Sequence, residues 1–153
     1  MLLAKDPRTF QVLADTVDSS IGAAYDHASR ALSLPPHPKG PGAALETFCA
    51  EPTLDSELGT NIGPFVTPMR NKMAFSFSGV LSQLAIPLQR LEEEPASNVK
   101  LAYARAFQKA AARHLTDKLL MALSSCRQDG LHIRHLVVSG GVASNMFIRN
   151  QLV

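Results

Sequence analysis

The sequence predicts an α/β protein with few strands and several flanking helices. Three short apolar or alternating runs predict strands at 10–17, 73–77 and 135–139. A much longer segment, 98–127, carries apolar residues at helical spacing and predicts the longest helix. The last strand is followed by two glycines and a helix start, an order of elements that is typical of a phosphate site.

The N-terminal part of the chain predicts a strand, a helix and a loop. Alternation places Phe10 and Val12 on one face of the strand. Asp18 and Ser19 are good N-cap residues for the next helix, which the spacing of apolar residues predicts over 21–34. The proline-rich run that follows cannot continue a helix and predicts a loop.

The middle of the chain alternates between short elements and breaks. A short helix is predicted over 43–50, and the prolines and glycines of 51–71 predict mostly irregular structure. The alternation of the strand at 73–77 puts its two phenylalanines on one face, where we expect them to pack in the core. A helix is predicted over 80–91, although Pro87 weakens the prediction for its second half.

The long helix has one apolar stripe, formed by Phe107, Ala111, Leu115, Leu119, Ala122 and Leu123. Gly130 then closes the helix in the manner of a C-cap. The final strand, Leu136 to Ser139, is short and would pair on both sides, so three strands would make a thin sheet with open edges. We therefore favour a piece of a larger α/β protein over a complete α+β domain.

Length and composition exclude several classes of protein. The 153 residues suffice for one domain with a core, and the net charge of +2 does not by itself indicate nucleic-acid binding. Two cysteines without a pairing pattern favour a reducing compartment. No apolar run reaches the roughly 20 residues of a membrane helix, and the N-terminus resembles neither a signal peptide nor a transit peptide.

Gly140, Gly141 and Asn145 are the first candidates for a binding site. Glycines let backbone N–H groups approach a phosphate, and an asparagine amide donates to a phosphate or ribose oxygen. The alternative is an ordinary strand-to-helix turn in which Asn145 only starts the helix. The residues alone leave both interpretations open.

Asp26 is the next candidate. It lies four residues after Gly22, whose place inside a predicted helix indicates close approach of another backbone or of a ligand. A carboxylate at this position would accept hydrogen bonds from ribose hydroxyls. The alternative is a solvated position on the surface, where aspartates in helices are more often found.

Three segments, in the same order, resemble the tRNA threonylcarbamoyladenosine synthase family, the TsaD-type proteins. They are DSSIGAAYDHASRALSL at 18–34, FSFSG at 75–79 and SGGVASN at 139–145. The resemblance implies that residues 1–153 form part of one lobe of the fold shared by actin, sugar kinases and the Hsp70 ATPase. The sequence of the last segment resembles that of the bacterial and mitochondrial branch of the family. This resemblance implies a mitochondrial location, or otherwise a cytoplasmic one.

The resemblance implies a tRNA-modifying acyltransferase. Members of this family transfer a threonylcarbamoyl group from threonylcarbamoyl-adenylate to N6 of the adenine beside the anticodon of tRNA, and AMP leaves. The family motifs place substrate contacts at Asp26, Gly40, Gly140, Gly141 and Asn145 of this chain. The chain departs from the family at Ala23, where bacterial members usually carry glutamate, and at Lys39, where the family has glycine.

The family also uses a divalent metal or iron, and the resemblance implies that the ligands are absent from this chain. Its H-x-x-x-H pair, its D-N-G segment and its first glycine motif, V-S-G-G-H-T-Q, have no counterpart here. His132 and His135 flank a strand start, where residues three apart point to opposite faces. We predict no metal site and no catalytic residue on this chain, and no transfer by the chain alone.

Other functions fit the same sequence. The chain is alternatively a non-catalytic partner that pairs with a full-length relative, a homodimer of the same family, or another ATPase or kinase of the same fold group. Arg105, Lys109 and Arg113 form a basic stripe on the long helix. Such a stripe is usually a solvated face, and the alternative is contact with tRNA phosphates.

Overall fold

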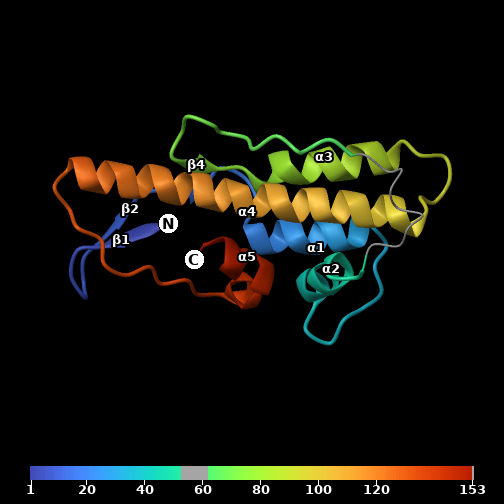
Figure 1. Ribbon diagram of the computed structural model, residues 1–153, viewed down its shortest axis with the longest axis horizontal. Coiled ribbons are helices and arrows are strands. Elements are labelled where there is room, and N and C mark those ends of the chain that lie inside the picture. Colours follow the sequence, from blue (N-terminus) through green and yellow to red (C-terminus); the bar gives the residue numbers. More distant parts are fainter. Residues whose placement is uncertain (53–61, 153) are drawn as a thin grey trace.

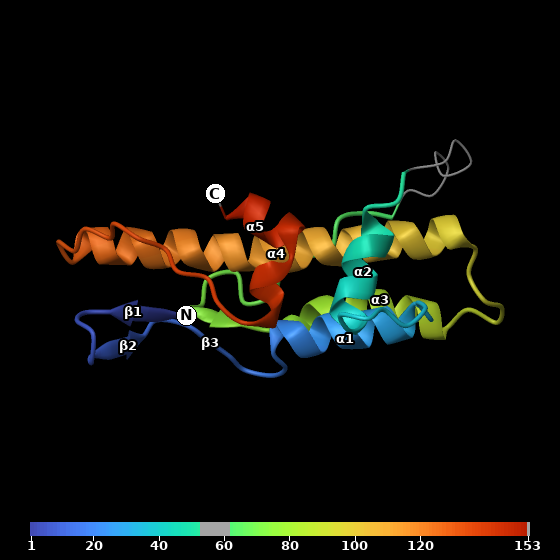
Figure 2. The same ribbon diagram turned by 90° about the horizontal axis from the view of Figure 1, so that it is seen from below.

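A computed structural model describes residues 1–52 and 62–152 of the chain. The long helix α4 (Ser97–Gln128) runs the length of the molecule, and α1 (Ile21–Ala31) and α3 (Phe77–Gln89) lie against it as a second layer (Figures 1 and 2). The protein is therefore mixed α/β, mostly helical with a few short strands, which agrees with the predicted class.

The remaining elements are short. The other helices are α2 (Pro41–Cys49), the 3-10 helix η2 (Gly141–Ser144) and α5 (Met146–Gln151). The strands are β1 (Leu2–Ala4), β2 (Phe10–Val12), β3 (Asp15–Thr16) and β4 (Ala74–Phe75).

The strand predicted over 10–17 is two strands with different partners. β2 pairs antiparallel with β1, with Leu2 opposite Val12, whereas β3 pairs in parallel with β4. The turn between β1 and β2 is closed by the carboxylate of Asp6, which accepts hydrogen bonds from the N–H groups of Arg8 and Thr9 at 2.8 and 2.9 Å. A single alternating run could not show that the chain changes partner halfway along it.

The strand predicted over 73–77 is shorter than expected, because the chain turns into a helix at its end. Ser76 is the N-cap of α3, and its hydroxyl accepts a hydrogen bond from the Gly79 N–H at 3.2 Å. Phe77 therefore lies in the first turn of the helix. Phe75 and Phe77 are nevertheless both buried and stack with ring centroids 5.5 Å apart, so the expected core packing is confirmed.

The prediction of a strand over 135–139 is wrong, because the structure has no strand there. The segment is extended but pairs with no strand among residues 1–52 and 62–152, and Leu136, Val137 and Val138 are 52, 85 and 46% exposed. A strand requires a neighbour that takes up its backbone hydrogen bonds, and an apolar run shows only the local preference. In Figures 1 and 2 the segment runs back from the end of α4 toward α5.

The helix termini follow local chemistry. Ser20, two residues after the predicted Asp18, is the N-cap of α1 and accepts from the Ala23 N–H at 3.2 Å. The predicted helix over 43–50 begins earlier, at Pro41, a residue type that is favoured in the first helical turn. Gly130 has φ +75° after α4, which confirms its predicted role as a C-cap glycine.

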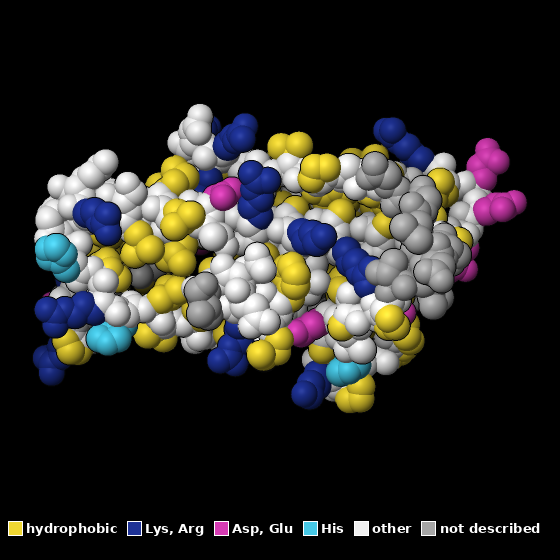
Figure 3. Space-filling view, in the orientation of Figure 1, with side chains coloured by type: hydrophobic (Ala, Val, Ile, Leu, Met, Phe, Trp, Pro, Cys, Tyr) yellow, Lys and Arg dark blue, Asp and Glu magenta, His cyan; other side chains and the backbone are white. Residues whose placement is uncertain are grey.

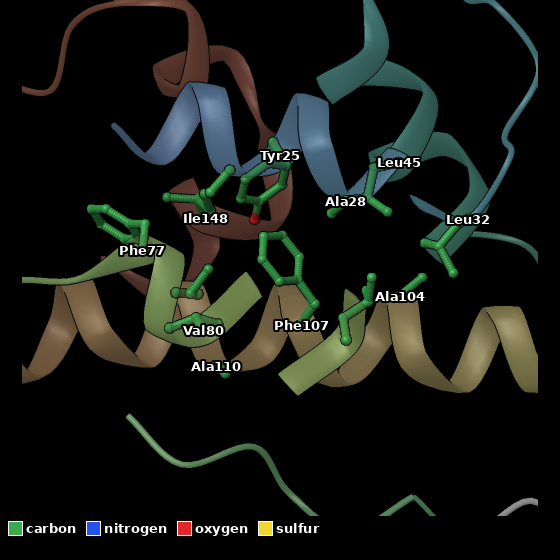
Figure 4. Close-up of a cluster of buried hydrophobic side chains, with 14 of the residues drawn as sticks. Tyr25, Ala28, Leu32, Leu45, Phe77, Val80, Ala104, Phe107, Ala110 and Ile148 are labelled. Atoms are coloured by element: carbon green, nitrogen blue, oxygen red, sulfur yellow. The ribbon is translucent and has the colours of Figure 1, made fainter. Parts of the chain in front are cut away.

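The core lies where α1, α2, α3, α4 and α5 meet (Figure 4). Tyr25 of α1 and Phe107 of α4 meet edge to face at its centre, with ring centroids 5.3 Å apart. Alanines such as Ala28 and Ala104 are fully buried between the helices and permit close approach. This packing confirms the apolar stripe predicted for the long helix at Phe107, Ala111 and Ala122, whereas Leu123 is 39% exposed.

The buried face of α4 also carries polar side chains that the stripe did not predict. His114 is fully buried, and its Nε2 accepts a hydrogen bond from the Ser76 N–H at 3.1 Å. Lys118 is 1% exposed and its Nζ donates to the Met69 carbonyl oxygen. These two contacts fasten the segment from Met69 to Ser76 to the middle of α4.

One region of the surface is apolar. Figure 3 shows apolar side chains gathered between the C-terminal half of α4 and the segment that follows it. Exposed large apolar residues of these elements and of the β1–β2 hairpin include Leu2, Phe10, Leu120, Leu136 and Val138. No helix in the described part of the chain has the length and hydropathy needed to cross a membrane.

Candidate functional site

A cleft of about 640 Å³ lies between the N-terminal half of α1, the loop that leads into α2, and the segment from Ser139 to Asn145. Its lining includes all five residues predicted as a site: Asp26, Gly40, Gly140, Gly141 and Asn145. The fold thus brings residues 139–145 beside two segments of the N-terminal part of the chain, 20–26 and 39–46.

The helix α1 forms one wall of the cleft. Gly22 faces η2: a β-carbon at this position would lie 3.6 Å from Cγ2 of Val142, an ordinary van der Waals distance. The sequence predicted that another backbone or a ligand approaches Gly22 closely. In the structure, the neighbour of Gly22 is instead the side chain of Val142. One turn later, Asp26 is half-buried in the cleft. Its Oδ1 would lie 3.6 Å from a β-carbon placed on Gly42.

The loop into α2 forms the second wall. Gly40 has φ +96°, a backbone conformation that favours glycine, and it precedes α2 as a cap without a side-chain hydrogen bond. Its N–H donates to the His37 carbonyl oxygen at 2.9 Å, and its own carbonyl accepts from Ala43 and Ala44 at 3.2 Å each. The helix start is thus presented to the cleft by a fixed turn.

The glycine turn forms the third wall. Gly140 has φ +99°, and in the described part of the chain no atom beyond the adjoining residues lies within 4 Å of the position of a β-carbon at Gly140 or at Gly141. The backbone conformation requires glycine at 140, and the open space beside both residues leaves their main chain accessible from the cleft. The Ser144 hydroxyl closes the 3-10 turn by donating to the Gly141 carbonyl at 2.7 Å.

Asn145 is 5% exposed and is the N-cap of α5. Its Oδ1 accepts a hydrogen bond from the Ile148 N–H at 2.9 Å. Its Nδ2 makes no hydrogen bond with any residue of the described chain, and the residue lines the cleft. The interpretation of Asn145 as a helix-start residue is therefore confirmed, while one end of its amide remains available as a donor.

Glu46 lines the same cleft and was not predicted. Its Oε1 accepts a hydrogen bond from the Met146 N–H at 2.7 Å, which fastens the start of α5 to α2. The partners are 100 residues apart in the sequence, so no local pattern could indicate this contact.

Asp18, predicted as the N-cap of α1, instead binds the N-terminus of α3. Its carboxylate accepts from the Ser76 hydroxyl at 2.6 Å and from the Phe77 N–H at 3.0 Å. Next to it, the hydroxyls of Ser19 and Ser78 are hydrogen-bonded at 2.9 Å. This cluster joins the segment between β3 and α1 to the start of α3, and so holds the wall of the cleft that begins at Ser20.

The environment of Asp18 also changes its pKa. Burial alone would raise the pKa of this carboxyl, but the hydrogen bonds from Ser76, Ser78, Ser19 and Phe77 outweigh that effect. The pKa therefore lies below its usual value, because these donors stabilise the charged carboxylate.

The basic stripe on α4 is only partly a solvated face. Arg105 donates to the carbonyl oxygens of Cys49, at 3.1 Å, and Glu51, so it fastens the end of α2 to α4. Arg113 is paired with Asp117 at 3.8 Å. These residues and Lys109 line a second cleft of about 510 Å³, which shares no residue with the first.

The described residues offer no metal centre. Among residues 1–52 and 62–152 there is no group of three or more histidine, cysteine or acidic side chains placed to hold an ion. His132 and His135 are both exposed. The residues present therefore do not fit the metal that the family resemblance implies, and no ligand is assigned to this chain.

The fold and the cleft define a mixed α/β protein in which a glycine turn at the start of a short helix faces a second helix that carries a carboxylate. The chain belongs to the TsaD family: the family model described as tRNA N6-adenosine threonylcarbamoyltransferase matches residues 1–153.

Individual relatives agree with this family. A tRNA N6-adenosine threonylcarbamoyltransferase of Staphylococcus aureus (strain MRSA252) is 31% identical over 152 residues, which are 99% of this chain and 41% of the relative. A protein of the same name from Shouchella clausii is 32% identical over 94% of this chain and 39% of the relative. An Arabidopsis thaliana protein named "Probable tRNA N6-adenosine threonylcarbamoyltransferase, mitochondrial" is 30% identical over 99% of this chain and 33% of its own length.

The chain thus spans about two fifths or less of the curated relatives it matches, with 41, 39 and 33% of these three covered.

Proposed function

We propose that this chain forms the nucleotide-facing part of a tRNA N6-adenosine threonylcarbamoyltransferase, and that its cleft holds the adenylate portion of threonylcarbamoyl-adenylate. Residues 1–153 would then be part of one lobe of the fold shared by actin, sugar kinases and the Hsp70 ATPase. One observation carries the proposal: the five residues that the family motifs associate with substrate line one cleft. The cleft volume, about 640 Å³, lies within the range usual for small-molecule sites.

Each wall of the cleft offers a different part of the recognition. The main chain at Gly140 and Gly141 offers N–H donors to the phosphate, and Nδ2 of Asn145 donates to a phosphate or ribose oxygen. Asp26, on the opposite wall, accepts hydrogen bonds from ribose hydroxyls. Gly40 keeps the loop into α2 free of a side chain beside the ligand.

The chemical step needs more than this cleft. Attack by the weakly nucleophilic N6 amine of a tRNA adenine requires that the amine be oriented toward the carbamoyl carbon, after which AMP leaves. No catalytic residue is proposed on this chain, and none of its described residues fits a metal that would assist the step. We therefore expect the chain alone to bind the adenylate without modifying tRNA, and tRNA modification by residues 1–153 without added protein would contradict this.

The proposal is tested by separating the two roles of Asn145. In Asn145→Ser, the hydroxyl still accepts from the Ile148 N–H as a helix cap, but the amide donor is lost. We expect AMP to bind about 1–3 kcal/mol more weakly, as for a lost hydrogen bond to a charged group, measured by isothermal titration calorimetry. Asn150→Ser on the same helix, which is exposed and outside the cleft, is the matched control and should leave AMP affinity unchanged.

Unchanged AMP affinity in Asn145→Ser, with the fold retained by circular dichroism, would remove Asn145 from the site. Absence of AMP binding by the wild-type chain would contradict the proposed function itself.

A second candidate function is favoured by the exposed apolar surface near the β1–β2 hairpin and the segment after α4. Leu2, Phe10 and Val137 are 60, 58 and 85% exposed, and contiguous apolar surface commonly marks a protein interface. In this alternative the chain pairs with a full-length relative and regulates it without catalysing transfer. Co-purification with such a relative, and loss of its tRNA modification when this chain is removed, would support the alternative.

We also propose a mitochondrial location. It is supported by the motif SGGVASN at 139–145, which resembles the bacterial and mitochondrial branch, and by the mitochondrial name of the Arabidopsis relative. Fractionation of cells that express the protein from its own gene tests this location.

A further inference from the structure

The cleft has an unusual balance of charge for a site that would hold a phosphate. Its charged lining residues are two carboxylates, Asp26 and Glu46, and one ammonium group, Lys39. Oε1 of Glu46 already accepts a hydrogen bond from Met146, so this carboxylate is part of the cleft's frame. The side chains of the cleft thus carry a net charge of −1, obtained from two acidic groups and one basic group.

A phosphate entering this cleft would be repelled by both carboxylates, since like charges in a partly desolvated site are screened less than in bulk water. The backbone donors at Gly140 and Gly141 supply only partial positive charges. Lys39 supplies the full positive charge among the lining residues, and lysine is a common phosphate-binding residue that acts as a point charge.

Lys39 is held at the rim of the cleft by its main chain. Its N–H donates to Nδ1 of His37 at 3.1 Å, and the next residue, Gly40, donates to the His37 carbonyl oxygen at 2.9 Å. The side chain of Lys39 is exposed and forms no ion pair within the described chain, where the pairs are Lys100 with Glu94 and Arg113 with Asp117. The fold therefore fixes the position of Lys39 while leaving its ammonium group available.

We infer that Lys39 is a specificity-determining residue that contacts the phosphate of the nucleotide. This inference rests on the proposed function and deepens it: the cleft prefers a 5′-phosphorylated nucleoside to the nucleoside because of Lys39. A chain with glycine at this position would have no full positive charge for the same phosphate, only the backbone donors and the amide of Asn145.

The test compares AMP with adenosine as ligands of the wild-type chain, Lys39→Ala, Lys39→Arg and Lys72→Ala. Lys72 is also exposed but lies outside the cleft, so Lys72→Ala controls for the general loss of one positive charge. Dissociation constants are measured by calorimetry at low and at high salt. Because Lys39 is exposed, we expect Lys39→Ala to weaken AMP binding by about three- to fivefold at low salt, with less effect at high salt.

The expected result is a loss of AMP affinity in Lys39→Ala, unchanged adenosine affinity, recovery in Lys39→Arg, and no change in Lys72→Ala. An AMP-to-adenosine preference that is the same in wild type and Lys39→Ala would overturn the inference while leaving the nucleotide site in place. A wild-type chain that binds neither ligand would remove the nucleotide site and the role of Lys39 together.

Discussion

Asn145 shows how one residue serves structure and, in our proposal, binding. Its Oδ1 caps α5 through the Ile148 N–H, and its Nδ2 has no partner in the described chain. The sequence predicted both roles as alternatives, since asparagine is common at helix starts and also donates well to phosphates. The two roles are compatible because they use opposite ends of the same amide.

Asp18 is a residue whose environment the sequence did not reveal. It was predicted to cap the helix that follows it, but it binds Ser76 and Phe77, which lie 58 and 59 residues further along the chain. We expect Asp18→Asn to lower the free energy of unfolding by about 1–2 kcal/mol, because the charged acceptor at the start of α3 is lost. Urea unfolding at neutral pH measures this change, with Asp15→Asn as the control, because the Asp15 carboxylate accepts its hydrogen bond from the N–H of its chain neighbour Thr16.

The stabilisation by Asp18 should depend on pH in a defined direction. Its pKa in the folded state lies below the usual value, because hydrogen bonds outweigh burial. The contribution is therefore present above the usual aspartate pKa of about 3.9 and is lost as the pH falls toward the lower folded value. A difference between wild type and Asp18→Asn that stayed constant through this acid range would contradict the assignment.

His114 should respond to acid at a higher pH. Burial, and then the neighbouring Lys118, hold the pKa of this imidazole below its usual value. The folded state therefore favours the neutral ring, and stability falls as the pH drops below the usual histidine pKa of about 6.5, where the unfolded chain binds the proton more readily. In His114→Gln this part of the pH dependence should disappear, which thermal unfolding between neutral and mildly acidic pH would show.

At the scale of elements, the long helix was well predicted and the strands were not. Helical spacing over some thirty positions is a strong local signal, and α4 spans Ser97–Gln128 as expected within a residue at each end. Strands depend on partners that are distant in the sequence: β3 pairs with β4, about sixty residues away. The run at 135–139 has strand composition but no strand partner among the described residues.

The glycine turn and α5 depend on α2 for their position. Glu46 on α2 accepts from the Met146 N–H, so the segment that carries Gly140, Gly141 and Asn145 is anchored at its C-terminal side. We expect Glu46→Ala to speed amide hydrogen exchange across 146–151, because the start of α5 loses its anchor. Glu46→Gln keeps an acceptor oxygen and should retain most of the protection, and equal exchange in wild type and Glu46→Ala would contradict the anchoring role.

At the scale of the whole molecule, the sequence predicted which residues share the cleft better than how the fold arranges them. Residue chemistry indicated Gly140, Gly141, Asn145 and Asp26, the family motifs added Gly40, and all five line one cleft. Their arrangement depends on Glu46, Asp18 and the turn at Gly40, which no local pattern showed. The family assignment was therefore accessible from three short segments, while the packing that brings these segments together required the structure.

Nuclear magnetic resonance of a labelled chain tests most directly whether this cleft binds the adenylate. On titration with AMP, we expect the amide signals of Gly40, Gly140, Gly141 and Asn145 to shift together with one dissociation constant. Shifts confined to the second cleft, for example at Ala102 and Ala106, or no shifts at all, would contradict it.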